Sequence, residues 1–436
     1  MPAAPTGIFD SHRPPSRDLV DDCVHCGFCL PTCPTYALWL EEADSPRGRI
    51  YLTRMGLDGR AAFTPSYLKH FDACLGCLAC VTACPSGVQY GALIEAVRPQ
   101  IERHTTRPLA DRLFRRLIFA LFPYAGRLRA LVWPLWVYQR SGLQRLVRGS
   151  GLLGLLPRRL QALESLTPHV SLATARATVP AVVPARGPRR LRVGLLLGCV
   201  QRAFFGHVNA ATARVLAAEG CEVVAPPDQG CCGALAAHAG EEDRALEAAR
   251  RTIDVFDAAG VDLVVTNAAG CGSTLKEYGR LLADDPRYAA RAAALASRVR
   301  DVSEVLADLE PVAPRQPLPL RIAYHDACHL LHGQGVTRPP RQVLGTIPGL
   351  EVVEIPEGSM CCGSAGIYNL VQPEAAHELG ARKARHVLGT GADAVVSSNP
   401  GCLLQLQAEL RRTGRALPML HLVEVLDASL RGETPF

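Results

Sequence analysis

One stretch decides the fold of the amino-terminal part of the chain: Cys23-Val-His-Cys26-Gly-Phe-Cys29-Leu-Pro-Thr-Cys33-Pro34. The same spacing returns as Cys74-Leu-Gly-Cys77-Leu-Ala-Cys80-Val-Thr-Ala-Cys84-Pro85. In each copy two residues separate the first three cysteines, and three residues precede a fourth that is followed by proline. This is the bacterial spacing for a cubane iron–sulfur cluster. The chain therefore predicts two [4Fe–4S] clusters within its first hundred residues.

In this pattern the fourth cysteine of one motif ligates the cluster of the other motif. Two ligand sets follow, and we call them the first set (Cys23, Cys26, Cys29 and Cys84) and the second set (Cys33, Cys74, Cys77 and Cys80). Gly27 and Gly76 lie inside the two loops, where a missing Cβ would let backbone N–H groups approach the sulfide of a cluster. Two zinc sites are the alternative, but zinc ribbons use paired C-x2-C knuckles and have no use for the third and fourth cysteines.

Between the motifs, Ser45-Pro46-Arg47-Gly48-Arg49 is typical of a capped helix start with proline at the first position. Arg47 and Arg49 either belong to that helix alone, offset the charge of the clusters, or meet an acidic surface of a partner. His25 lies within the first loop, and with four thiolates available we expect it to be a solvated loop residue.

The carboxyl-terminal half contains an internal repeat. Cys199 and Cys328, Cys231-Cys232-Gly233 and Cys361-Cys362-Gly363, and Cys271 and Cys402 recur 129, 130 and 131 residues apart. Each copy opens with an apolar stretch (191–197 and 320–324) and has a second one before its last cysteine. Apolar strands that alternate with helical patterns predict an α/β unit with a mainly parallel sheet, used twice. Sites in such sheets lie at the carboxyl ends of the strands.

The repeats supply two further groups of cysteines. We call them the first thiol group (Cys199, Cys231, Cys232 and Cys271) and the second thiol group (Cys328, Cys361, Cys362 and Cys402). Each group is either a site for an additional metal or cluster, or a cluster of buried, reduced thiols. Cys221 falls outside the pattern, so we expect it in the core. His325, Asp326, His329 and His332 surround Cys328 and either relay protons, complete a metal site, or hold a loop.

Composition limits the remaining possibilities. The chain has 436 residues, 48% hydrophobic and 20% charged, with a net charge of +6, and is therefore globular. No signal peptide and no apolar stretch long enough to span a bilayer is evident, which predicts a cytoplasmic protein or one that is peripheral on the inner face of the plasma membrane. Seventeen cysteines in a reducing compartment are expected to bind metal or carry redox chemistry rather than to form disulfides.

Residues 101–160 carry twelve arginines against Glu102 and Asp111. Apolar side chains, among them Trp133 and Trp136, interleave with these cations at helical spacing. Such helices could lie on an anionic membrane, dock onto a partner, or bridge domains within the chain. Nothing in the sequence resembles a nucleic-acid recognition fold. Gly149-Ser-Gly151-Leu-Leu-Gly154 matches a dinucleotide fingerprint by letter, but no strand precedes it, so we reject it as a cofactor loop.

These observations predict a multidomain chain that is part α+β and part α/β. Its expected parts are a helical two-cluster ferredoxin-type domain at 1–100, a basic helical segment and linker at 101–190, and cysteine-rich α/β repeats at 191–310 and 320–436. Proline-rich stretches at 167–190 and 311–319 are the expected linkers.

On these motifs the chain resembles the iron–sulfur subunit of glycolate oxidase (glycolate dehydrogenase). Leu30-Pro-Thr-Cys-Pro-Thr-Tyr36, Ser45-Pro-Arg-Gly-Arg-Ile50 and Tyr324-His-Asp-Ala-Cys-His329 carry the resemblance, which covers nearly the whole chain. The resemblance implies a flavin-containing partner that oxidises the 2-hydroxy acid, while this chain passes electrons toward the respiratory chain and a quinone-linked acceptor.

The chain is less closely similar to the iron–sulfur subunits of anaerobic glycerol-3-phosphate dehydrogenase and of heterodisulfide reductase. The alternative function is therefore an iron–sulfur subunit of a lactate or glycerol-3-phosphate dehydrogenase, or a thiol redox subunit like that of heterodisulfide reductase. In the heterodisulfide reductase pattern each repeat ends Cys-x2-Cys, whereas here the last position is Thr274 or Gln405. That difference puts a five-thiolate centre in doubt.

Overall fold

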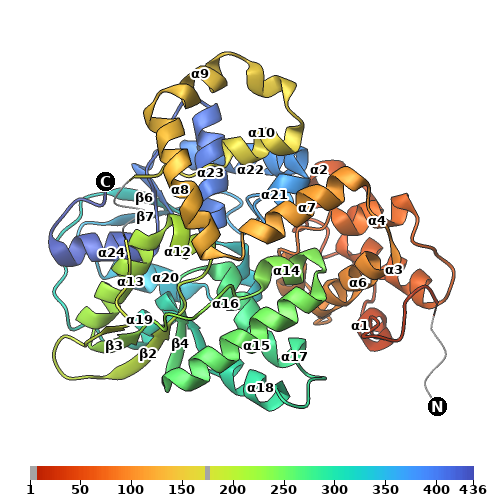
Figure 1. Cartoon of the computed structure of the whole chain (residues 1–436), viewed down its shortest axis with the longest axis horizontal. Coiled ribbons are helices and arrows are strands. Elements are labelled where there is room, and N and C mark those ends of the chain that lie inside the picture. Colours follow the sequence, from red (N-terminus) through yellow and green to blue (C-terminus); the bar gives the residue numbers. More distant parts are fainter. Residues whose placement is uncertain (1–6, 172–176) are drawn as a thin grey trace.

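The computed structural model describes residues 7–171 and 177–436. Its amino-terminal helices gather on one side, two α/β units form the bulk of the molecule, and the basic segment arches over them (Figure 1). This mixed architecture, a helical domain followed by two α/β repeats, agrees with the fold class predicted from the sequence.

Short helices around the cysteine loops build the amino-terminal domain. Ser45 caps α3 by accepting a 3.0 Å hydrogen bond from the Gly48 N–H, and Pro46 is the first helical residue, as the sequence predicts. The core of this domain contains Phe71, Leu93 and Val97. Its elements are α1 (Arg17–Asp21), α2 (Pro34–Trp39), η1 (Glu42–Asp44), α3 (Pro46–Leu57), α4 (Pro65–Asp72), α5 (Ala79–Thr82) and α6 (Tyr90–His104).

The basic segment is helical and crosses both repeats. Its α8 packs on α12 of the first repeat, while its α10 packs on α21 and α22 of the second. The Arg411 guanidinium strengthens the second contact by donating to the Ser165 carbonyl at 2.7 Å. The elements are α7 (Leu109–Leu121), α8 (Ala125–Arg140), α9 (Leu143–Gly149), η2 (Leu152–Leu155) and α10 (Arg158–Ser165). No strand precedes the glycines at 149–154 in this part of the described chain, which agrees with their rejection as a cofactor loop.

The first repeat is a five-stranded sheet of order β1-β3-β2-β4-β5. Gly194 lies in β2 directly under α15, where a Cβ would come within 2.9 Å of the Phe256 ring, so this glycine permits close packing of helix on sheet. The strands are β1 (Val182–Val183), β2 (Leu191–Leu195), β3 (Cys221–Val224), β4 (Leu263–Thr266) and β5 (Val299–Asp301). The helices are α12 (Val200–Phe204), α13 (Gly206–Ala218), α14 (Ala234–Ala239), α15 (Glu242–Ala259), α16 (Ala269–Lys276), α17 (Tyr278–Leu281), α18 (Ala289–Ser297) and α19 (Val302–Asp308).

The second repeat is a four-stranded sheet of order β7-β6-β8-β9, in which every pairing is parallel. This order matches β3-β2-β4-β5 of the first repeat, whose pairings are also parallel. The strands are β6 (Arg321–Tyr324), β7 (Glu351–Glu354), β8 (Ala394–Val396) and β9 (Met419–Leu420). The helices are the π-helical turn η3 (His329–Gly333), α20 (Arg338–Gly345), α21 (Tyr368–Val371), α22 (Pro373–Gly389), α23 (Pro400–Arg412) and α24 (Leu422–Arg431).

The two repeats share an apolar cluster, besides the separate clusters centred on each repeat. Helix α13 of the first repeat packs on α24 of the second, and α19 of the first packs on α20 of the second. Since α13 and α20 are equivalent in chain order, as are α19 and α24, the contacts are reciprocal, as in a twofold dimer. Buried residues of both sheets, including Leu195, Val265, Tyr324 and Val396, belong to a single apolar cluster. The carboxyl ends of the central strands carry the thiol groups.

The structure differs from the sequence prediction in the stretch 167–190. We expected a linker there, yet Val182 and Val183 form β1, which pairs antiparallel with Val223 and Val224 of β3. A run of two β-branched residues is too short to distinguish a strand from a linker in the sequence. The strand forms because the free edge of β3 supplies hydrogen-bond partners for the backbone of Val182 and Val183. Part of this stretch, residues 172–176, lies outside the described residues.

Candidate metal centres

Four thiols of the first set surround a small cavity at the surface of the amino-terminal domain. Cys23, Cys26, Cys29 and Cys84 line it, and Cys80 also reaches its wall. Cys26 is exposed, while the other three members of the set are half-buried. Two loops fifty residues apart are thus folded so that the last cysteine of the second motif lies beside the first three of the first motif. This arrangement is compatible with the ligand set that the spacing predicts.

The second set lies deeper, and all four of its cysteines are buried. Cys33 is the N-cap residue of α2, and its sulfur lies 3.3 Å from Thr35 Oγ1 and 3.7 Å from the Asp44 carbonyl oxygen. Burial raises the pKa of the Cys77 and Cys80 thiols well above the ordinary value. Such thiols stay neutral by themselves, and a coordinated metal ion would deprotonate them. Cys74 differs: burial opposes its ionisation, but Arg49, Arg98 and the Tyr90 hydroxyl together lower its pKa.

Arg49 is a cation buried beside the second set. Its side chain is 1% exposed, and its guanidinium lies 3.1 Å from Thr35 Oγ1 and 3.4 Å from Asp44 Oδ1. Of the roles open from the sequence, contact with a partner surface is therefore wrong for Arg49, because no partner can reach it. A fixed positive charge at this position favours thiolate over thiol at Cys74.

Arg47 lies nearer the surface and holds the first loop. It pairs with Glu42 at 2.6 Å and donates to the carbonyl of His25 at 3.0 Å. His25 is exposed, as expected of a solvated loop residue. Gly27 and Gly76 adopt φ values of 89° and 65°, which an L side chain disfavours. The N–H of Gly76 points at the Cys74 sulfur at 3.4 Å, and its predicted approach to cluster sulfide stays a prediction.

The first thiol group gathers at the ends of β2 and β4. Cys199 Sγ lies 3.5 Å from Cys231 Sγ, and the Gly233 N–H lies 3.4 Å from the same Cys231 sulfur. Hydrogen bonds from the Cys199 and Cys232 thiols lower the pKa of Cys231 well below its ordinary value. Cys232 in turn contacts Cys271. The sequence-predicted group of four is therefore brought together.

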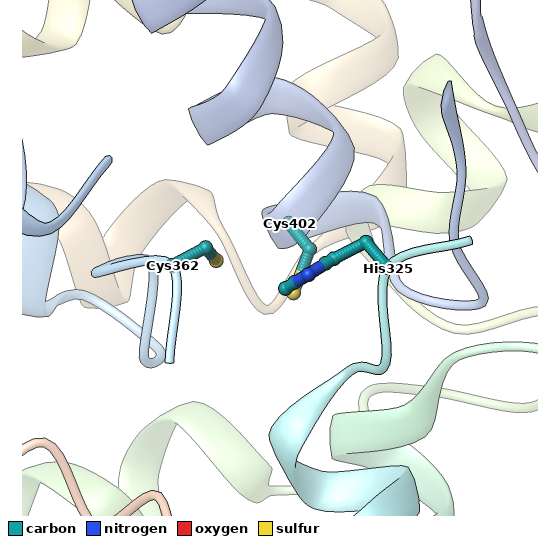
Figure 2. A group of neighbouring side chains, drawn as sticks. All are labelled: His325, Cys362 and Cys402. Atoms are coloured by element: carbon teal, nitrogen blue, oxygen red, sulfur yellow. The ribbon is translucent and has the colours of Figure 1, made fainter. Parts of the chain in front are cut away.

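The second thiol group repeats this geometry and adds a histidine. Cys328 Sγ lies 3.9 Å from Cys361 Sγ, the counterpart of the contact between Cys199 and Cys231. The ligand atoms of His325, Cys362 and Cys402 all lie within 4.8 Å of one another. Figure 2 shows these three side chains converging from three separate segments.

The surroundings of His325 show whether a metal ion fits between this histidine, Cys362 and Cys402. It is 1% exposed, and neither ring nitrogen has a hydrogen-bond partner within the described structure. Burial, together with Lys383, lowers its pKa to about 3, so the ring is neutral. A buried imidazole without partners costs free energy, whereas neutral imidazole with thiolates is a donor set that suits zinc or iron. The residues present therefore fit a metal ion.

The other polar residues of this loop have separate places. Asp326 pairs with Arg341 at 2.7 Å, which fixes the loop, while the His329 ring lies tilted against that of His238, with ring centroids 4.7 Å apart. His332 reaches across to the amino-terminal domain, where its Nδ1 lies 2.7 Å from Thr82 Oγ1. Only His325 of the three histidines joins the thiols of Cys362 and Cys402.

Steric constraints explain why glycine occupies the third position of each Cys-Cys-Gly motif. Gly233 and Gly363 have φ values of 83° and 90°, which favour glycine. A Cβ on Gly233 would lie 3.2 Å from the Ala245 carbonyl oxygen of α15, and one on Gly363 would lie 2.6 Å from that of Ala376 in α22. The motif thus lets the cysteine loop approach the backbone of the following helix in both repeats.

The positions that lack a fifth cysteine are filled by other contacts. Gln405 donates to the Ala376 carbonyl at 2.9 Å and accepts from Asn369 at 3.1 Å, so its amide is fully engaged in structure. Thr274 is buried in α16. Cys221 is fully buried in β3 among apolar residues, as predicted.

The proximity of the second set to the second thiol group could not be predicted from the sequence. Cys77 of the second set belongs to the same apolar cluster as Cys328 and Cys361 of the second thiol group, and Leu75 and Ala79 are members of it too. The electrostatic influence of Cys328 on Cys77 is consistent with this proximity, since it helps raise the pKa of the Cys77 thiol after burial. More than two hundred residues separate the partners in the chain, so no local spacing could have indicated the contact.

Comparison with known proteins supports the same division of the chain. The model of the 4Fe-4S dicluster domain matches residues 22–88, and that of the cysteine-rich domain matches 193–276 and 322–407. The model described as the glycolate oxidase iron–sulfur subunit linker region matches 110–167. The fold and its cysteines thus define an iron–sulfur protein with one dicluster domain and two cysteine-rich domains.

Curated relatives narrow this class. A probable glycolate oxidase iron–sulfur subunit of Bacillus subtilis is 40% identical over 93% of each chain. The glycolate oxidase iron–sulfur subunit of Escherichia coli is 34% identical over 98% of this chain and 100% of its own. Lactate utilization protein A of Halalkalibacterium halodurans is 30% identical over 54% of this chain and 97% of its own. The chain belongs to the family of glycolate oxidase iron–sulfur subunits, which are parts of an oxidoreductase.

Proposed function

We propose that this chain is the electron-transfer subunit of a membrane-associated glycolate-oxidising complex. It takes electrons from a flavin-containing partner, which holds the substrate site, and delivers them toward the respiratory chain. Family membership and the printed names of the two relatives that span nearly the whole chain support this proposal.

The observation that carries it is the ordered burial of the cysteines. The first set includes the exposed Cys26, the second set is wholly buried, and the second thiol group adjoins the second set. An electron-transfer protein needs one cluster near the surface, close to the electron donor, and further clusters in an interior from which water is excluded. We propose that the first and second sets each hold one [4Fe–4S] cluster, a group that supplies one-electron transfer when bound.

Exposed apolar side chains surround the part of the first set that reaches the surface. Val24 and Phe28 lie in the first loop and are 68% and 66% exposed. They flank Cys26, so a partner that covers them would bring its flavin near the first set and would remove apolar surface from water. We propose this face as the contact with the flavin subunit.

We further propose that His325, Cys362 and Cys402 hold a metal in the second repeat. Support comes from the unpartnered imidazole and the short separations of its ligand atoms. The first thiol group lacks a histidine at the equivalent place, because Leu196 stands three residues before Cys199 where His325 stands three residues before Cys328.

The basic segment is the proposed membrane contact. Within residues 7–171 and 177–436, none of the helices has the length and apolarity that crossing a bilayer would take. Many of the exposed large apolar side chains of the described chain lie between 109 and 160, among them Leu113, Leu117, Trp133 and Leu146. Arg112 and Arg116 are exposed next to the first two. This mixture matches a surface that lies on anionic lipid.

Two measurements test these proposals. The chain co-purified with its flavin subunit should become reduced when glycolate is added anaerobically, as seen by EPR, and should respond more weakly to lactate or glycerol-3-phosphate. Reduction of the chain by glycolate without any partner would contradict the placement of the substrate site. In sedimentation with vesicles, the chain should bind phosphatidylglycerol and not phosphatidylcholine, and L113S/L117S should lose this binding. Equal binding to both lipids would contradict the membrane contact.

A further inference from the structure

A large cavity lies between the basic segment and the first repeat. Its volume is about 530 Å³, within the range typical of small-molecule sites. One wall comes from the end of α7 and the start of α8, and the opposite wall comes from α12, α15 and the Cys-Cys-Gly loop of the first repeat. None of its lining residues belongs to the first set or the second set.

The lining is strongly cationic. Arg127, Arg202, Arg244 and Arg251 face the cavity, against one carboxylate, that of Glu247. Among the described residues, Arg202 and Arg251 donate only to main-chain carbonyls, those of Pro227 at 3.4 Å and Asp228 at 3.0 Å. Within that part of the chain neither forms an ion pair with a carboxylate, whereas Arg244 does.

The other two arginines are engaged differently. Arg127 lies over the Tyr124 ring at 4.0 Å, and Arg244 pairs with Glu241 at 3.2 Å. Burial and the nearby Arg129 lower the pKa of Arg202, which fits a cation without a counter-ion. Guanidinium groups bind carboxylate, sulfonate and phosphate groups through paired hydrogen bonds. The charge of this cavity is therefore unbalanced and favours an anion.

Apart from Gln229, most of the remaining side chains in the lining are apolar. Phe119, Pro123, Tyr124 and Leu235 contribute rings and aliphatic carbon to the wall. A two-carbon acid would fill little of this space, whereas a molecule with a planar ring would cover these side chains. Cys199 and Cys231 of the first thiol group also line the cavity, so a ligand in it would lie against sulfur.

We propose that this cavity binds an organic anion with a planar apolar body, its acidic group held by Arg202 and Arg251 and its body beside the first thiol group. The inference concerns binding alone, so it stands or falls independently of the proposed electron transfer.

A pair of probes that differ in charge tests it. Calorimetric titration of the intact, anaerobically purified chain compares 2-naphthoate with 2-naphthamide, which share a ring system. Naphthoate should bind at least about tenfold more tightly, because only the anion pairs with the guanidinium groups. Equal affinity for the two probes, or no binding of naphthoate, would overturn the proposal.

Variants locate the site. Arg251→Gln changes an exposed side chain and should weaken naphthoate binding about tenfold, as should Arg202→Gln. Arg287→Gln removes the same charge from an exposed position outside the cavity and should leave affinity unchanged. Retained affinity in both cavity variants would refute the assignment, as would displacement of naphthoate by an equal concentration of glycolate, which lacks the ring.

Discussion

The hydroxyl of Thr82, in the second cysteine loop, lies 2.7 Å from Nδ1 of His332, in the second repeat. His332 Nε2 lies 3.0 Å from the Ser359 carbonyl, which can only accept, so Nδ1 accepts from Thr82. This bond crosses the boundary at which Cys77 meets Cys328 and Cys361. It therefore fixes the second set against the second thiol group.

A double-mutant cycle measures that bond. Thr82→Val and His332→Ala should each destabilise the protein by about 1 kcal/mol, and the pair should show a coupling of about 0.5 to 1.5 kcal/mol. Urea unfolding supplies the four free energies. Strict additivity would show that the two side chains do not interact in solution.

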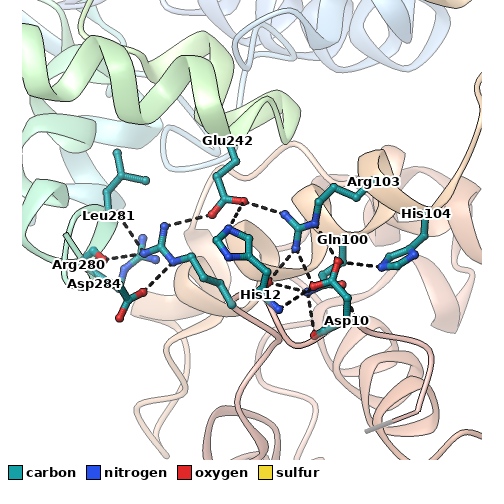
Figure 3. Close-up of polar contacts among 10 residues, drawn as sticks. Asp10, His12, Gln100, Arg103, His104, Glu242, Arg280, Leu281 and Asp284 are labelled. Carbon is teal, nitrogen blue, oxygen red and sulfur yellow. Dashed lines mark hydrogen bonds and ion pairs between the residues drawn. The ribbon is translucent and has the colours of Figure 1, made fainter. Parts of the chain in front are cut away.

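A second boundary joins the amino-terminal domain to the first repeat through Glu242. This carboxylate accepts from Arg103 at 2.7 Å and from Arg13 at 3.1 Å, and it lies 3.5 Å from His12 (Figure 3). Glu242→Gln keeps the shape but removes the charge, and should cost about 1 to 2 kcal/mol of unfolding free energy. Glu378→Gln, at an exposed site, is the control and should change stability little. An equal loss in both variants would argue against the interface.

The second thiol group should account for metal beyond the amino-terminal domain. Cys362→Ala and Cys402→Ala should lower the metal content per chain while leaving the EPR signals of the amino-terminal clusters unchanged. Cys221→Ala also removes a buried cysteine, but one outside the group, and should retain all metal. Elemental analysis checks this, and unchanged metal in the first two variants would show that the group is a cluster of reduced thiols.

His421 makes stability depend on pH. Its Nε2 donates to the Asn267 carbonyl at 2.8 Å, and burial, aided by His207, lowers its pKa from 6.5 to about 4. Between about pH 6.5 and pH 4, His421 is protonated in the unfolded chain but neutral in the folded chain. The contribution of this group to the free energy of unfolding is therefore complete above about pH 6.5, and it is lost as the pH falls toward 4.

His421→Asn keeps a capping side chain for α24 but cannot titrate. Between pH 7 and about pH 5, the unaltered protein should lose about 1 to 2 kcal/mol more stability than this variant. His207 and Glu424 face His421 and are present in both proteins, so their own titration largely cancels in the difference. Parallel stability curves for the two proteins would contradict the assignment.

Local features of the structure could be predicted from the sequence, and contacts between distant parts could not. The capped helix at Pro46, the parallel strands and the gathering of each thiol group follow from spacing and apolar pattern within a single domain or repeat. The position of Cys77 beside Cys328 depends instead on how complete domains pack. The buried role of Arg49 was one of several roles that the sequence left open, because burial at a given position cannot be inferred from an arginine in a helix start.

The central claim is that two iron–sulfur clusters occupy the amino-terminal domain, and metal analysis with EPR tests it most directly. The intact chain purified without oxygen should contain about eight irons bound to the first and second sets, and should give signals of reduced clusters after dithionite. A colourless, EPR-silent chain that contains zinc in place of iron would contradict the account.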